Sequence, residues 1–157
     1  MADPEVQDLL KRGYRYALSL CHDPARAEDL AQEAWASMLS AGGRRDKPYL
    51  FRAIRSRWID AHRRRQVLSF EPLARPADLA DDRTDPRDVD RAALQRAMAT
   101  LRPQEREALY LCVVEGYSAT EAAELMGCPR NTVLSLAHRG RARLRAWFAS
   151  QTQQEAL

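Results

Sequence analysis

The sequence predicts an all-α protein of two small helical bundles, joined by a flexible acidic linker, with a helix-turn-helix in the second bundle. Three features support this prediction. Proline and glycine divide the 157-residue chain into segments whose apolar residues recur at helical spacing. β-branched residues are few and never alternate over four or more positions, so no strand is expected. Residues 76–90 contain six aspartates and two prolines, a composition typical of a solvated linker.

Three helices are expected before residue 66. Asp3-Pro4 and Asp23-Pro24 each combine a capping side chain with a proline suited to the first turn, and Gly42-Gly43 ends the second helix. The third begins at about Pro48, after the basic loop GGRRDK. Its apolar residues recur at every fourth position and predict a buried stripe: Leu50, Ile54 and Trp58. A compact three-helix bundle is the result.

Four more helices are expected from about residue 88. The first ends at Arg102-Pro103, and the second runs to about Glu115 and is closed by Gly116. Ser118 and Glu121 have capping-box spacing and start the third helix, and a long last helix reaches about Ala149.

The segment 118–145 has the pattern of a helix-turn-helix. Ala123, Gly127 and Val133 occupy the small, glycine and apolar positions that let two helices pack closely around a tight turn. An ordinary helical hairpin is the alternative. It does not account for the polar, acid-free face expected on the second helix: Arg130, Asn131, Leu134, Ser135, His138, Arg139 and Arg141.

Arginine is concentrated in two helices, although the net charge is only +3. Residues 52–65 hold six arginines against one acid, and residues 130–145 hold five arginines and no acid. Such residues often just coat a solvated face. Two clusters, one in each bundle, instead favour a nucleic-acid partner, because arginine pairs with phosphate and releases counterions from DNA.

Enzymatic and membrane functions have little support in the sequence. The three cysteines, Cys21, Cys112 and Cys128, form no CxxC pair and are interpreted as small buried hydrophobes rather than a disulfide framework. No metal-ligand spacing, phosphate loop or catalytic triad is present, so neither a metal nor another cofactor is expected. No signal peptide or membrane-spanning run is expected either, which favours the cytoplasm.

Three motifs, in order, resemble the extracytoplasmic-function (group 4) sigma factors of the sigma-70 family. DPARAEDLAQEAW is similar to a signature of region 2, YLFRAIRSRWIDAHRRR to the helix that follows it, and residues 101–145 to region 4. The resemblance covers about residues 4–66 and 90–148. It implies region 2 at 1–66, a linker at 67–89 and region 4 at 90–157.

The resemblance implies that region 2 binds core RNA polymerase and opens the promoter. Asp29, Gln32 and Glu33 would dock on the β′ clamp helices, although a solvated face is the simpler interpretation of these residues. The −10 promoter element would be bound by residues of the third helix: Arg52, Arg55, Ser56, Asp60, Arg63 and Arg64. Ser56 departs from the family, which commonly has asparagine there.

Region 4 of the family enters the major groove at the −35 element and touches the β flap. The matching residues here are Arg130, Asn131, Leu134, Ser135, His138 and Arg139. Leu134 and Leu136 replace two basic residues of the family pattern, and Ala137 replaces its leucine. We expect Leu136 to take the core position and Leu134 to face outward, toward a thymine methyl group or a protein partner.

The favoured function is a transcription initiation factor without catalysis of its own. It would direct core polymerase to specific promoters, and a separate anti-sigma factor would control it, as the family implies. Two alternatives remain: a helix-turn-helix regulator that binds DNA without polymerase, and a sigma-like mimic that sequesters an anti-sigma factor.

Overall fold

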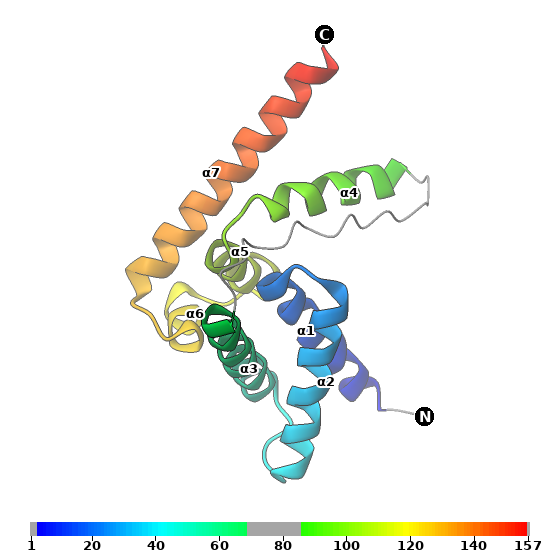
Figure 1. Cartoon of the computed structure of the whole chain (residues 1–157), viewed down its shortest axis with the longest axis vertical. Coiled ribbons are helices and arrows are strands. Elements are labelled where there is room, and N and C mark those ends of the chain that lie inside the picture. The colour runs from blue at the N-terminus through cyan, green and yellow to red at the C-terminus, as the bar shows by residue number, and fades with distance from the viewer. Residues whose placement is uncertain (1–2, 69–85, 157) are drawn as a thin grey trace. The chain divides into compact units, whose positions relative to one another are not determined.

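The computed structural model describes residues 3–68 and 86–156, with side chains described for 3–65 and 91–156 (Figure 1). These ranges are helical and contain no strand, and the chain divides into two compact units. The all-α prediction with two helical bundles is therefore confirmed. One helix ends at Leu68 and the next begins at Pro86, so both extend into the predicted linker 67–89. Residues 69–85 of that linker lie outside the described residues.

The first unit contains α1 (Pro4–Cys21), α2 (Pro24–Ser40) and α3 (Lys47–Leu68), packed against one another in pairs. Both Asp-Pro starts work as expected. The Glu5 backbone N–H donates to Asp3 Oδ1 at 3.1 Å, and the Ala25 N–H donates to Asp23 Oδ1 at 3.0 Å. Each carboxylate thereby satisfies an amide that the helix leaves without an internal acceptor.

The core of the first unit joins α1 to α3. The rings of Tyr16 and Phe51 stack with centroids 4.4 Å apart, and both side chains are fully buried, as are Leu50 and Ile54. Trp58, predicted as part of this stripe, is only half-buried and stacks on His62 at 5.5 Å. That prediction was wrong although Trp58 lies on the same side of α3 as the fully buried Ile54 and Phe51: one turn beyond Ile54, this side of the helix is only partly covered.

The second unit contains α4 (Pro86–Ala99), α5 (Pro103–Leu109), α7 (Arg130–Glu155) and most of α6 (Ala119–Met126). The helix expected to run to Glu115 instead changes to a π-helical turn, Tyr110–Val114, in which the Tyr110 hydroxyl donates to Glu115 Oε1 at 2.8 Å. The last helix passes Ala149 and ends at Glu155, since no glycine or proline lies between these two residues.

Packing in the second unit centres on α5 and α7 (Figure 1). Gly140 lets the helices approach closely, because a Cβ atom there would lie 2.7 Å from Leu109 Cδ1. Glu105 is fully buried beside this contact, and its Oε2 atom lies 3.3 Å from Arg143 Nε. An ion pair therefore crosses between the two helices beside the approach of Gly140 to Leu109.

The three cysteines are partly buried, so the prediction that they are buried small hydrophobes was too strong. Cys21 Sγ donates to the Ala17 carbonyl at 3.2 Å and to the Asp23 carbonyl at 3.3 Å. Burial raises the pKa of Cys21 above its usual value, and burial also raises the pKa of Cys112. Among the described helices, none is long and apolar enough to cross a membrane.

Candidate nucleic-acid interface

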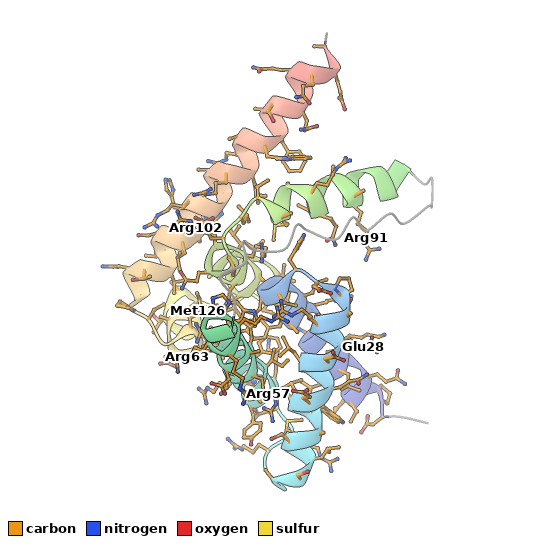
Figure 2. All side chains as sticks on the ribbon, in the orientation of Figure 1. Glu28, Arg57, Arg63, Arg91, Arg102 and Met126 are labelled. Carbon is orange, nitrogen blue, oxygen red and sulfur yellow. The ribbon has the colours of Figure 1, made fainter. Side chains whose placement is uncertain are left out.

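The acidic face of α2 is set by the packing of its opposite side. Ala27, Leu30 and Ala34 follow one another at spacings of three and four and are buried on one side of α2, which leaves the opposite side in solvent. The predicted docking residues Asp29, Gln32 and Glu33 are accordingly exposed. Gln32 Nε2 donates to Glu28 Oε1 at 3.1 Å, one turn earlier on the same helix; Glu28 is labelled in Figure 2.

The predicted −10 residues share one half of the circumference of α3. Arg52, Ser56, Asp60 and Arg64 recur at every fourth position, and Arg55 and Arg63 directly precede two of them, while buried Leu50 and Ile54 lie in the other half. Arg55 is half-buried and the others are exposed: Arg52, Ser56, Asp60, Arg63 and Arg64. Figure 2 labels Arg63 on this helix, and with it Arg57, which is not among the predicted −10 residues.

A polar groove between α2 and α3 brings parts of these two faces together. It encloses about 580 Å³. Asp29 and Glu33 line it from α2, and Ser56, Asp60 and Arg64 line it from α3. Gln32, Arg52, Arg55 and Arg63 are not part of the lining. The two surfaces predicted as separate sites therefore share one depression of the first unit.

Three arginines that are not among the predicted site residues also line this groove: Arg26, Arg57 and Arg65. Burial, and then the nearby positive charge of Arg65, lowers the pKa of the Arg26 guanidinium. Two cations facing each other across a groove favour an anion between them. Helical spacing alone could have predicted Arg26 as part of this surface, because it precedes Asp29 by three residues and so shares its side of α2.

The helix-turn-helix has the capping box and the glycine turn that the sequence predicted. Ser118 and Glu121 form both halves of the capping box, at 3.1 Å and 2.8 Å, and start α6. Gly127 has φ +65°, a left-handed conformation that glycine adopts without strain. The Cys128 N–H then donates to the Ala123 carbonyl at 3.2 Å, and α7 begins at Arg130.

One side of α7 is packed and the other is open. Val133, Leu136, Ala137 and Gly140 are buried. All six residues predicted for −35 DNA are exposed: Arg130, Asn131, Leu134, Ser135, His138 and Arg139. Leu136 is 8% exposed and Leu134 45%, which confirms that Leu136 takes the core position and Leu134 faces outward.

Comparison with known proteins identifies both units. Residues 6–67 match the family model of sigma-70 region 2, and residues 91–144 match that of sigma-70 region 4. The RNA polymerase sigma factor CarQ of Myxococcus xanthus is 34% identical over 151 residues, which cover 90% of this chain and 82% of CarQ. The chain belongs to the extracytoplasmic-function sigma factors of the sigma-70 family. It is thus a transcription initiation factor, as the resemblance implied.

Two further relatives extend over nearly the whole sigma factor chain. The ECF RNA polymerase sigma factor SigE of Mycolicibacterium smegmatis is 31% identical over 165 residues; they cover 98% of this chain, which spans 64% of that relative's length. The sigma factor RpoE of Bartonella quintana, solved in complex with the anti-sigma factor NepR, aligns with a TM-score of 0.70 and 25% identity. That alignment covers 92% of this chain and 94% of RpoE.

Proposed function

We propose that this sigma factor divides promoter recognition between its two units. Residues 1–66 act as region 2, which binds core RNA polymerase and opens −10 DNA, and residues 90–157 act as region 4, which binds the −35 element. Residues 67–89 connect them. The factor acts in the cytoplasm, where polymerase and promoter DNA are found, and it catalyses no reaction itself.

The groove between α2 and α3 carries this proposal for region 2. Asp29 and Glu33 present carboxylates at one wall, and Arg64 presents a guanidinium at the other. Asp29, Gln32 and Glu33 dock on the β′ clamp helices. The −10 strand lies along α3, where the exposed Arg52, Arg63 and Arg64 hold phosphates and Ser56 and Asp60 face the bases. Polymerase and promoter therefore meet at neighbouring surfaces of one unit.

The acid-free face of α7 supports the assignment of region 4. A recognition helix places its N-terminal residues on base edges in the major groove while flanking cations hold the backbone. Arg130 and Asn131 are in the first turn of α7, and Ser135, His138 and Arg139 follow on the same exposed side. The second unit also meets the polymerase β flap.

Control by an anti-sigma factor completes the proposal. The structurally similar RpoE of Bartonella quintana was solved with its anti-sigma factor NepR, and it matches this chain over both units. A partner that covers the acidic face of α2 blocks polymerase binding, and it also covers part of the DNA-binding surface, because Arg64 lines the same groove. Release of that partner then makes the factor available to core polymerase.

Run-off transcription with purified core polymerase and a promoter library tests the assignments. Asp29→Ala with Glu33→Ala is expected to abolish binding to core, and Arg63→Ala with Arg64→Ala is expected to leave core binding intact and abolish initiation. Charge-matched controls come from exposed residues of α1: Glu5→Ala with Asp8→Ala, and Lys11→Ala with Arg15→Ala.

Three results would contradict the proposal. Equal losses in the test and control variants would mean that charge, not position, matters. Core binding without initiation at any promoter would favour a sigma-like mimic. DNA binding that needs no polymerase would favour a plain helix-turn-helix regulator.

A further inference from the structure

Leu134 is an apolar side chain in the middle of a polar, basic face. It is 45% exposed, and its neighbours one helical turn away are Arg130, Asn131 and His138, all exposed. Leu134 is not required for core packing, because Val133 and Leu136 fill the core positions on either side of it. Packing of the second unit therefore does not explain a leucine at this position.

The surroundings of Leu134 fit a single small apolar group better than a protein partner. Protein docking sites present contiguous apolar patches of a few hundred Å². Leu134 instead stands alone among exposed polar and cationic side chains of α7, from Arg130 to Arg139. In the DNA major groove the 5-methyl group of thymine is a lone apolar group among polar base edges, with phosphates on both sides.

We propose that Leu134 packs on the 5-methyl group of a thymine in the −35 element and selects for that base. This inference rests on the proposed function, in which α7 enters the major groove there. Arg130 and Arg139 hold the flanking phosphates and set the depth of the helix, while Leu134, in its second turn, reaches the base edge. Leucine has no donor or acceptor, so it distinguishes thymine by the methyl group alone.

Deoxyuridine tests this contact directly, because it pairs as thymine does but lacks the methyl group. The assay uses the full chain with core polymerase and the promoter selected from the library. Each −35 thymine is replaced by deoxyuridine, one position and one strand at a time, and promoter occupancy is measured by competition. With the wild-type factor, one replacement is expected to lower occupancy about fourfold, the effect of one lost methyl contact.

The protein variant identifies the residue. Leu134→Ala is expected to bind the thymine and deoxyuridine promoters equally, so the fourfold difference disappears. Val113→Ala is the control: Val113 is 62% exposed in the π-helical turn, outside α7, and its variant should keep the full difference. Leu134→Lys should select a different −35 sequence from the library.

The outcomes separate this inference from the function beneath it. Initiation that is insensitive to every deoxyuridine replacement, or a selected −35 element without thymine, overturns the methyl contact and leaves the sigma assignment standing. If Leu134→Ala instead lowers occupancy by the same factor on the thymine and the deoxyuridine promoter, the fourfold difference between the promoters remains. This result also overturns the methyl contact and assigns Leu134 to a protein contact. Absence of initiation at every promoter removes both proposals together.

Discussion

Arg143→Ala is expected to loosen the packing of α7 on α5 far more than the loss of an ordinary surface arginine. Glu105 Oε2 accepts the Arg102 backbone N–H at 3.0 Å and lies 3.3 Å from Arg143 Nε. Glu105 Oε1 is buried without a hydrogen-bond partner among the described residues. Without the guanidinium, a buried carboxylate would keep a single backbone donor.

The magnitude follows from the unequal burial of the two side chains. Removing one partner of a fully buried pair costs about 3–5 kcal/mol, whereas an exposed pair contributes about 1 kcal/mol or less. The Glu105 side chain is 1% exposed and that of Arg143 is 46% exposed, so solvent screens the pair from one side. We therefore expect a loss of about 2 kcal/mol, which raises the opening equilibrium of this contact about 30-fold.

Hydrogen exchange followed by mass spectrometry resolves this effect within the full chain. The amides of α5 should exchange about 30-fold faster in Arg143→Ala. Arg145→Ala is the matched control, an exposed arginine two residues along α7, and should change the same amides by less than about threefold. Adding Glu105→Gln to Arg143→Ala should recover part of the loss, because the buried charge is removed. Equal rates in the two arginine variants would refute this reasoning.

Four further outcomes are expected. Gly140→Ala should lower the free energy of unfolding by about 1 kcal/mol in urea, because the Cβ contact with buried Leu109 at 2.7 Å outweighs the helix propensity gained; a more stable variant would contradict the close packing. Ser118→Ala should cost about 1 kcal/mol and speed exchange at the start of α6, and unchanged exchange would mean that the capping box contributes nothing. Cys21, whose pKa burial raises, should react with iodoacetamide at pH 8 more slowly than in the unfolded chain. The Cys21 thiol ionises at a lower pH in the unfolded chain than in the folded protein. The wild type should therefore lose stability relative to Cys21→Ser as the pH rises through and above 9.0, and a stability difference that does not change with pH would contradict this.

Local features of the sequence predicted most helix starts. Asp23 caps α2 and Ser118 caps α6 as expected, since a cap depends on residues within one turn of each other. The ends were harder to predict. Nothing local distinguishes the π-helical turn Tyr110–Val114 from a continued α-helix, and α7 runs past Ala149 because no residue stops it.

For the candidate surfaces, too, features that depend on nearby residues were predictable and contacts between helices were not. Helical spacing was enough to place Asp29, Gln32 and Glu33 together and to turn Leu134 outward and Leu136 inward. It was not enough to place Arg26 beside Arg65, because these residues come from different helices. Trp58 failed for a related reason, since a stripe of three residues does not show where the neighbouring helix ends its contact.

The sequence alone determined the order of the α-helices and most of their starts, the polar faces of α2, α3 and α7, and the resemblance to sigma factors. All of these depend on residues within a few turns of one another or on motifs read in order. Only the tertiary structure decided that the acids of α2 and the arginines of α3 share a groove, and that Glu105 is buried against Arg143. Such contacts join residues about 30 to 40 positions apart, and the packing of whole helices, rather than any local preference, brings them together.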